Sequence, residues 1–142
     1  MMGEKNVKGR KRHIATDTLG NMLEVQVHAA NVFDSRRGGQ VCECVVQKYP
    51  TVKAFSADKG YRGTTFNFVE NILGLRIDIA SKPKKSKKGF KVIAKRWIVE
   101  RTFAWLGVFR RLAKDFEILT STAENMIRIA MIKITIAKCI QL

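Results

Sequence analysis

Two acids, Glu100 and Asp58, have the residue type and the setting best suited to chemistry in this sequence. Glu100 lies between Arg96 and Arg101, and both tryptophans of the chain lie within five residues of it. In a helix, Arg96 would stand one turn before Glu100, so the carboxylate would have a guanidinium group beside it. This arrangement suits an acid that holds a metal ion next to a groove for phosphates. From this stretch alone we favour a simpler interpretation, an ion pair on a solvated helix face.

Asp58 stands at the boundary between an apolar run and a glycine-rich turn. Residues 52–57 are predicted to form a strand buried on at least one face, and residues 59–63 a tight loop. In α/β sheets, ligands gather beyond the carboxyl ends of the strands, where Asp58 would lie. From local sequence alone, an aspartate that hydrogen-bonds its own turn explains this position equally well.

Together, these two acids are candidate ligands of a divalent cation. Mg²⁺ prefers a few carboxylates, completed by waters and phosphate oxygens. Two such ions, about 3.5–4 Å apart, activate the attacking oxygen and stabilise the leaving oxygen in phosphodiester chemistry. Asp58 and Glu100 would share such ions if the helix that carries Glu100 packs across the end of the strand before Asp58.

The other acids and the histidines have simpler explanations. Asp17 follows a short strand and begins a turn, so we expect it to cap its own turn rather than bind metal. His13 and His28 lack an acid or cysteine at ligand spacing and are expected on strand faces. Asp78 and Asp115 are expected in surface ion pairs.

The chain is strongly basic. It has 27 Lys and Arg against 12 Asp and Glu in 142 residues, a formal net charge of +15. Because 46% of the residues are hydrophobic, a disordered basic tail is excluded and a folded protein with a positive surface is predicted. The natural partner is a polyanion, most often nucleic acid.

Tyr61 and Trp97 could stack on an extruded base, although we favour core packing for Trp97. The candidate DNA-binding residues are Lys8, Arg10, Lys11, Arg12, Lys84, Lys85, Lys87, Lys88, Arg96, Arg101, Arg110 and Arg111.

The elements that position these side chains follow from the apolar pattern. Residues 13–17 and 22–28 alternate apolar and polar side chains around the turn residues 18–21, which predicts a β-hairpin. A helix is then expected to begin at the cap-type residue Asp34 and to end before Pro50.

The order of the predicted elements is strand, strand, helix, strand, helix, strand, basic loop, helix, helix. This order favours one α/β domain over residues 1–142, with helices packed on a mixed sheet. The last helix is expected to begin at a capping box formed by Ser121 and Glu124. Basic residues form an exposed lead-in over residues 1–12 and a loop over residues 82–91. After the first helix, elements are predicted at residues 52–57, 64–73, 75–80, 94–117 and from 121 onward.

Nothing in the sequence indicates export or membrane insertion. The three cysteines form no zinc pattern, and their odd number argues against a disulfide framework. The N-terminus lacks the apolar core of a signal peptide. Arg128, Lys133 and Lys138 interrupt the apolar C-terminal segment, which argues against a membrane span. A soluble cytoplasmic protein is therefore expected.

Four stretches of the chain form an ordered set: residues 7–14 with 17–20, residues 29–32 with Asp34, residues 57–63, and residues 96–105, continued by residues 111–117. Together they resemble bacterial insertion-sequence DDE transposases of the four/five group. The resemblance covers nearly the whole chain. It implies an RNase H-like catalytic core that cuts and joins DNA with two divalent ions, Mg²⁺ or Mn²⁺.

The resemblance also implies roles for single residues. Asp58 matches the second catalytic Asp of the family, and Glu100 matches its catalytic Glu. Arg96 matches the Arg that precedes this Glu by four residues. The Tyr of the family signature has no match because Ile93 occupies its position, and the Lys seven residues after the Glu is replaced by Gly107.

The largest departure from the family lies at the front of the chain. In the family, the first catalytic Asp lies on a strand upstream of the stretch that matches residues 8–12. Only seven residues precede Lys8 here, so that strand and the usual N-terminal DNA-binding region are expected to be missing. Asp17 matches the Asp at the end of the second strand and does not replace the first catalytic one. The expected fold is thus an RNase H-like mixed sheet flanked by helices, truncated at the N-terminus.

Three hypotheses about function follow from these expectations. The first is a transposase fragment for metal-dependent cleavage and strand transfer, inactive alone because neither ion would be fully held. The second is a non-catalytic DNA-binding remnant that regulates an intact transposase. The third is pairing with an upstream transposase fragment that rebuilds the site, or homodimerisation. In each case we expect the partner to be DNA. We expect the protein to lie in the bacterial cytoplasm, associated with the nucleoid.

Overall fold

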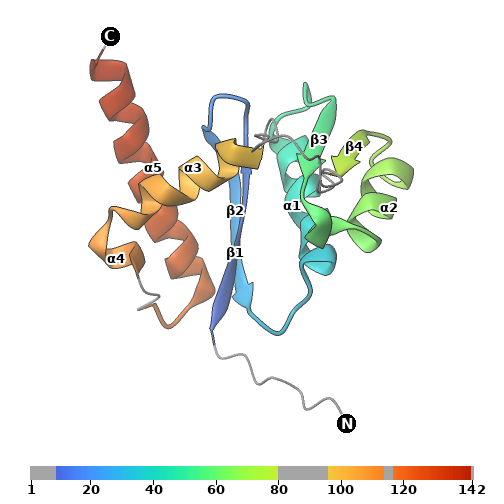
Figure 1. The fold of residues 1–142 in the computed structure, drawn as a ribbon, viewed down its shortest axis with the longest axis horizontal. Helices are drawn as coiled ribbons and strands as arrows, with labels where there is room; N and C mark the ends of the chain where they lie inside the picture. Colours follow the sequence, from blue (N-terminus) through green and yellow to red (C-terminus); the bar gives the residue numbers. More distant parts are fainter. Residues whose placement is uncertain (1–8, 80–95, 114–116, 142) are drawn as a thin grey trace, which may run out of the picture.

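The structure is a computed structural model that describes residues 9–79, 96–113 and 117–141. Its elements follow the order that the sequence predicts, which confirms a mixed α/β architecture (Figure 1). They are β1 (Arg10–Thr16), β2 (Met22–Ala29), α1 (Asp34–Lys48), β3 (Ala54–Ala57), the 3₁₀ turn η1 (Lys59–Tyr61), α2 (Thr64–Asn71), β4 (Arg76–Ile79), α3 (Arg96–Gly107), α4 (Arg110–Ala113) and α5 (Thr120–Ile140).

The predicted β-hairpin is confirmed. β1 pairs antiparallel with β2 along its whole length, starting with Arg10 opposite Ala29. The last three residues of the predicted basic lead-in therefore belong to a strand. Asp17 caps the turn as expected, since its carboxylate accepts the N–H groups of Leu19 and Asn21, both at 2.9 Å. Burial alone would raise the pKa of Asp17, but hydrogen bonds, those of Asn21 first, lower it below its ordinary value.

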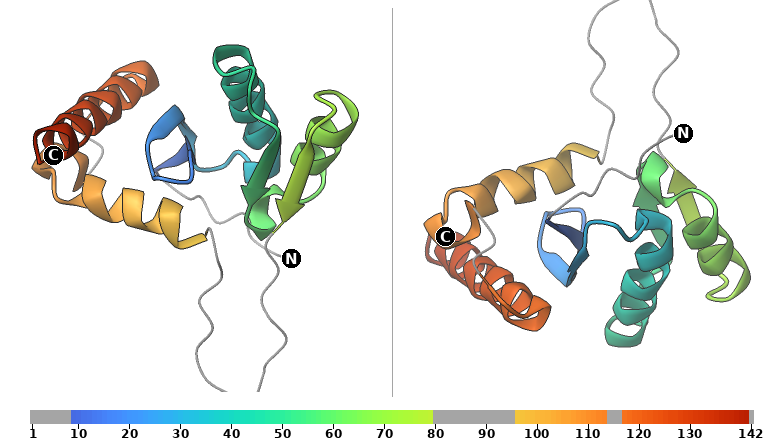
Figure 2. Two further views of the ribbon diagram at one scale, coloured as in Figure 1. Left: turned by 90° about the horizontal axis from the view of Figure 1, so that it is seen from above. Right: turned by 90° about the horizontal axis from the view of Figure 1, so that it is seen from below.

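A second, separate sheet consists of β3 and β4, which pair parallel. Helix α2 connects these two strands. Helix α1 packs on the hairpin and on α2, whereas α3 and α5 pack on the other side of the hairpin (Figure 2). One mixed sheet was the expectation, but the described residues form two sheets of two strands each, because β1 and β3 are not hydrogen-bonded to each other.

Two hydrophobic clusters correspond to the two sheets. The larger cluster fills the space between the hairpin and α5, where Val25 and Ile127 are fully buried. The smaller cluster contains Cys42 of α1, Val69 of α2 and Ile77 of β4. The hydrophobic core therefore consists of two separate clusters, one packed against each sheet.

The single helix predicted over residues 94–117 is wrong. Helix α3 ends at Gly107, and α4 follows as a separate turn. The N–H of Phe109 bonds the carbonyl of Leu106 at 3.1 Å, a three-residue bond that tightens the end of α3. Glycine favours such a break because it costs about 1 kcal/mol relative to alanine inside a helix.

The capping box predicted at Ser121 and Glu124 does not form. Helix α5 begins after Leu119, which makes no side-chain cap. The Glu124 carboxylate instead accepts the backbone N–H of Val27 at 2.9 Å. An N–H group on a strand edge needs such a partner when no further strand supplies one, so α5 closes the outer edge of β2. None of the helices in the described part of the chain is suited by length and apolar content to span a membrane.

Candidate functional site

A cavity of about 760 Å³ lies between the hairpin and the sheet of β3 and β4. Both predicted metal ligands line this cavity, Asp58 from the loop after β3 and Glu100 from α3. Both residues are also exposed. The fold thus places the two acids that the sequence singles out on the lining of one cavity, and a ligand that enters the cavity has access to both.

Asp58 caps its own turn while it faces the cavity. β3 ends at Ala57, and Oδ1 of Asp58 accepts the N–H of Gly60 at 2.9 Å, which caps η1. An ionised carboxylate has two oxygens and about four lone-pair sites. One hydrogen bond therefore leaves capacity for a cation. The turn-capping interpretation is correct for the local structure, and it is compatible with a metal-binding role.

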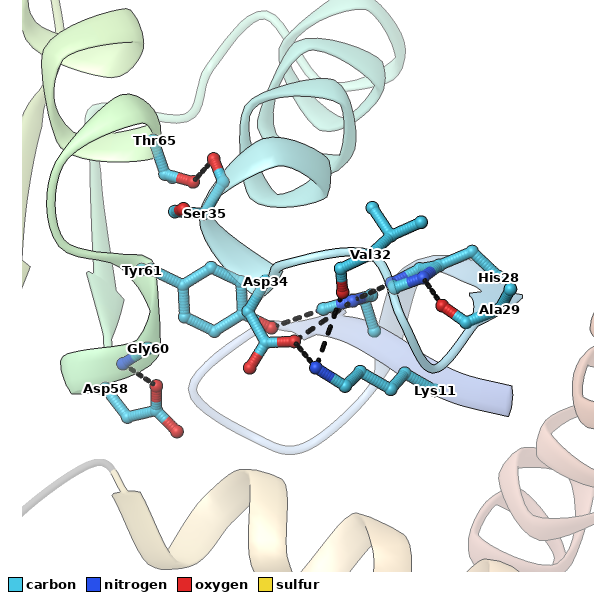
Figure 3. A network of polar contacts seen from close by, with 11 residues as sticks. Lys11, His28, Ala29, Val32, Asp34, Ser35, Asp58, Gly60, Tyr61 and Thr65 are labelled. Atoms are coloured by element: carbon cyan, nitrogen blue, oxygen red, sulfur yellow. Dashed lines mark hydrogen bonds and ion pairs between the residues drawn. The ribbon is translucent and has the colours of Figure 1, made fainter. Parts of the chain in front are cut away.

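Asp34 is a further acid of this region, for which the sequence predicts only a helix cap. That prediction is wrong, because Phe33 precedes α1 and makes no side-chain cap. Oδ1 of Asp34 instead accepts a hydrogen bond from Nζ of Lys11 at 3.0 Å (Figure 3). A Cβ added at Gly60 would lie 3.0 Å from Oδ2 of Asp34 and 3.2 Å from Oδ1 of Asp58. Asp34 and Asp58 thus flank the same glycine. The sequence signal that could have indicated a role for Asp34 in this site was the presence of an acid soon after the second strand.

Two buried histidines stack beside this acid. The rings of His13 and His28 have centroids 4.5 Å apart. Nδ1 of His28 donates to the carbonyl of Ala29 at 2.8 Å, so in the neutral ring its Nε2 is the acceptor for Nε2–H of His13. Nδ1 of His13 then accepts from the Tyr61 hydroxyl at 2.5 Å. The two stacked rings thus connect β1, β2 and η1 through hydrogen bonds.

The pKa values of His13 and Tyr61 favour the neutral forms of these two side chains. Burial lowers the pKa of His13 to about 4, and the electrostatic effect of the neighbouring His28 adds to the shift. Asp34 acts in the opposite direction, with Oδ1 3.9 Å from Nε2 of His13. Burial also raises the pKa of Tyr61 well above its ordinary value, with Asp34 and Asp58 adding to the shift.

Gly38 allows α1 to approach Tyr61 and Thr65 closely. A Cβ at this position would lie 2.5 Å from Cδ1 of Tyr61 and from Oγ1 of Thr65. Thr65 is buried and donates to the carbonyl of Ser35 at 2.7 Å. Gly38→Ala is therefore expected to lower the free energy of unfolding by about 1–3 kcal/mol through overpacking, despite the better helix propensity of alanine. Urea unfolding measures this change.

Gly107→Ala is the matched control for that substitution. Nothing lies within 4 Å of a Cβ added at Gly107. Alanine there is expected to leave the unfolding free energy unchanged or to raise it by up to about 1 kcal/mol. If Gly38→Ala is as well tolerated as Gly107→Ala, the close approach to Tyr61 does not limit the packing of α1.

The predicted DNA-binding residues differ in what their side chains contact. Arg110 and Arg111 on α4 are exposed. Arg10 donates to the carbonyl of Glu117, after α4, at 2.8 Å, and Arg12 donates to the carbonyl of Leu112, in α4, at 3.1 Å. These two arginines tie β1 to the C-terminal helices. The side chains of Lys8, Lys84, Lys85, Lys87, Lys88 and Arg96 lie outside the described part of the chain.

Arg101 lies between the two tryptophans. Its guanidinium carbon is 4.5 Å from the ring centroid of Trp97 and 4.6 Å from that of Trp105. Nη2 of Arg101 donates to the carbonyl of Leu19 at 3.1 Å. Arg101 thus stacks on two tryptophans of its own helix through cation–π contacts, and its hydrogen bond to Leu19 joins α3 to the hairpin turn. The expectation of core packing for Trp97 is wrong, since this side chain is 44% exposed.

The residues that line the cavity could supply some, but not all, of the ligands of a metal ion. Among the described residues, no group of three or more His, Cys, Asp and Glu is arranged to hold a metal ion. Asp58 and Glu100 nevertheless offer the carboxylate oxygens that Mg²⁺ prefers, on one accessible cavity. They fit as two ligands of an ion that takes its other ligands from water, from phosphate or from another polypeptide segment.

Comparison with known proteins finds a matching family model and a curated relative. A family model described as a transposase DDE domain matches residues 2–132. The chain is 31% identical over 116 residues to the transposase described for insertion sequence element IS402 of Burkholderia cepacia. This match covers 77% of the chain and 54% of the relative, so the chain spans about half the length of the curated relative that it matches. No solved structure was found to match the chain.

Proposed function

Because the chain belongs to the DDE-domain transposases of insertion sequences, we propose that it supplies two catalytic carboxylates for metal-dependent DNA cleavage and strand transfer. Asp58 and Glu100 are these carboxylates. The observation that carries the proposal is their position on the lining of one accessible cavity. Mg²⁺ or Mn²⁺ bound there would activate the attacking oxygen and stabilise the leaving oxygen of a phosphodiester.

The chain holds each carboxylate on a fixed element. Asp58 is restrained by the bond from Gly60 at the end of β3. Glu100 lies on α3, one residue before Arg101, which binds the hairpin turn. Thr102 is fully buried, and its hydroxyl contacts the carbonyls of Ile98 at 3.0 Å and Gly20 at 3.4 Å. Rigid attachment of this kind keeps catalytic groups in place while the substrate binds.

We infer further that the core is RNase H-like and that this chain is inactive alone. Two carboxylates leave two divalent ions incompletely held, and the described residues offer no third acid in a metal-binding group with them. Pairing with a further segment of transposase polypeptide would complete the site. DNA of the insertion-sequence ends and of the target is the proposed substrate.

A second candidate function is regulation of an intact transposase by a DNA-binding remnant. The net charge of +15 and the exposed arginines of α4 favour it, because they support DNA binding without catalysis. The two candidates differ in their need for the cavity acids. Regulation through DNA binding does not depend on Asp58, whereas cleavage and strand transfer do.

DNA binding by this chain is expected to weaken steeply with salt, because Lys and Arg release about 0.9 counterion for each phosphate that they neutralise. Arg110→Gln should reduce the slope of log affinity against log salt by about 1 if Arg110 contacts one phosphate. Fluorescence anisotropy with labelled duplex DNA in EDTA measures this slope. Asp58→Asn is the control and should leave DNA affinity unchanged without metal. An affinity that does not respond to salt would contradict DNA binding of either kind.

A further inference from the structure

Helix α5 has apolar residues on two of its sides. One side packs on β2, and its residues Ile127 and Met131 are buried. The other side carries isoleucines at spacings of three and four residues, each of them more than half exposed: Ile129, Ile132, Ile136 and Ile140. Such spacings place side chains on one face of a helix. These four isoleucines therefore form a single stripe, the α5 stripe, along the outer side of the fold (Figure 1).

A groove borders the middle of the α5 stripe. It has a volume of about 470 Å³ and lies between α5 and the first residues of β2. Ile132 and Ile136 of the stripe line the groove from α5, and Met22 and Leu23 line it from β2. Single exposed apolar residues are ordinary on protein surfaces, whereas a continuous apolar surface with polar residues around it marks a binding site. The α5 stripe and the groove together are such a surface.

Cations surround this apolar surface. Lys48 of α1 and Arg128 of α5 both line the groove. Glu24, the acid of the lining, is buried and accepts from Nζ of Lys48 at 2.6 Å and from Nη2 of Arg128 at 3.3 Å. Lys133, the residue after Ile132, is exposed beside the stripe. Two cations against one buried acid leave the lining of the groove positive.

The combination of isoleucines and cations discriminates between possible occupants. DNA would pair with the cations but would leave the isoleucines in water. A second copy of the chain would bring the cations of two grooves together, and each copy carries a net charge of +15. A lipid surface is flat, whereas Ile132 and Ile136 line a hollow. An amphipathic helix with acidic residues beside its apolar face matches the isoleucines, the hollow and the charge, and such helices bind in apolar grooves.

We propose that the α5 stripe and its groove bind an acidic amphipathic helix of another protein. The apolar face of that helix would lie against Ile132 and Ile136, and its carboxylates would pair with Lys48 and Arg128. The stripe is about 16 Å long at 1.5 Å per residue, so a partner helix of about eleven residues, or three turns, matches it. Neither of the proposed metal ligands lines this groove, and the inference does not depend on the proposed function.

Fluorescence anisotropy with labelled peptides tests this assignment on the full chain without DNA or metal. The probe is a helical peptide of about sixteen residues with leucines along one face and glutamates elsewhere. A peptide of the same composition with the leucines scattered around the helix should bind at least about tenfold more weakly than the probe. A peptide with lysines in place of the glutamates should also bind at least about tenfold more weakly.

Three outcomes of the peptide experiment would overturn the proposal. If the probe does not bind, the groove does not accept an acidic helix. If the scattered peptide binds as tightly as the probe, the net charge of the chain alone attracts both. If the lysine peptide binds as tightly as the probe, the cations of the groove do not select the occupant.

Ile132→Lys separates the groove from the overall charge of the chain. The substitution makes the chain more positive, so attraction by net charge alone would strengthen, whereas binding in the groove should weaken at least about tenfold. Ile72→Lys is the matched control, because Ile72 is 70% exposed at the end of α2 and does not line the groove. It should bind the probe at least as tightly as the unchanged chain. An unchanged affinity in Ile132→Lys would refute the groove as the binding site.

Two further measurements address the other occupants. Sedimentation equilibrium should give the same molar mass for the unchanged chain and for Ile132→Lys. Vesicles of phosphatidylcholine and phosphatidylserine should bind both proteins equally. Self-association or vesicle binding that Ile132→Lys abolishes would overturn the proposal, because the groove would then receive a second copy of the chain or a lipid surface.

Discussion

Asp58→Asn is expected to reduce Mg²⁺-dependent strand transfer by about a thousandfold or more. Loss of a metal ligand removes several kcal/mol of charge stabilisation, and each 1.36 kcal/mol corresponds to a factor of about ten in rate. The assay combines the chain with the transposase segment that completes its site, because the chain alone is expected to give no product. Mn²⁺ affinity of the isolated chain, followed by electron paramagnetic resonance, should fall at least about tenfold.

Asp17→Asn is the matched control for this experiment. Asp17 lines the same cavity, but its carboxylate is occupied by the hydrogen bonds of the hairpin turn. Strand transfer should change by no more than about twofold, the effect expected of a substitution outside the site. Normal activity of Asp58→Asn, or an equal loss in Asp17→Asn, would show that the catalytic carboxylates have been assigned wrongly.

Acidification below pH 6.5 is expected to destabilise the fold through His13. The pKa of His13 is about 4 in the folded chain, against 6.5 for the free side chain. Between these values the unfolded chain binds the proton and the folded chain does not, so the free energy of unfolding falls as the pH falls. A difference of about 2.5 pH units corresponds to about 3 kcal/mol. Urea unfolding between pH 7 and pH 5 measures the first part of this loss.

His13→Gln separates this effect from that of the acids. Glutamine keeps an acceptor for the Tyr61 hydroxyl but does not titrate. Asp17 and Glu24 have lowered pKa values, because hydrogen bonds and, for Glu24, the charge of Lys48 outweigh the effect of burial. They therefore destabilise the fold only at more acidic pH. The free energy of unfolding of the variant should depend less on pH between 6.5 and 5 than that of the unchanged chain. An equal pH dependence in the two proteins would place the titrating group elsewhere.

Elements set by short-range patterns were predicted well from the sequence. The hairpin follows from alternation on both sides of a turn that Asp17 closes with its own carboxylate. Helix α1 ends at Lys48, two residues before Pro50, as proline requires. Gly74 follows α2 with a positive φ of 66°, the conformation in which glycine commonly ends a helix. In each case, the residues that decide the structure are neighbours in the chain.

Some side chains could bond either a neighbour in the chain or a residue that is distant in the sequence, and the sequence did not predict which partner each of them has. Glu124 has the spacing of a capping box, but the backbone N–H of Val27 needs a partner that no strand supplies. Asp34 has the type of a helix cap, but Lys11 of β1 lies within 3.0 Å of it. The division into two sheets likewise depends on which strands meet in space. Local sequence cannot show such pairings.

The candidate site was predicted only in part from the sequence. The sequence singled out Asp58 and Glu100 by their settings at a strand end and on a helix, and the fold places both on one cavity. Their role as metal ligands remains a prediction. The supporting network of His13, His28 and Tyr61 was not predicted, because its members come from three elements that only the folded chain brings together.

The edge of β1 that has no partner strand among the described residues also affects how the chain behaves in concentrated solution. Unpaired strand edges pair with one another, so two copies of the chain can join through β1 and begin to aggregate. A net charge of +15 opposes this association, because like-charged molecules repel. Salt screens that repulsion. At high ionic strength this repulsion is weak, so it no longer opposes self-association through the edge of β1.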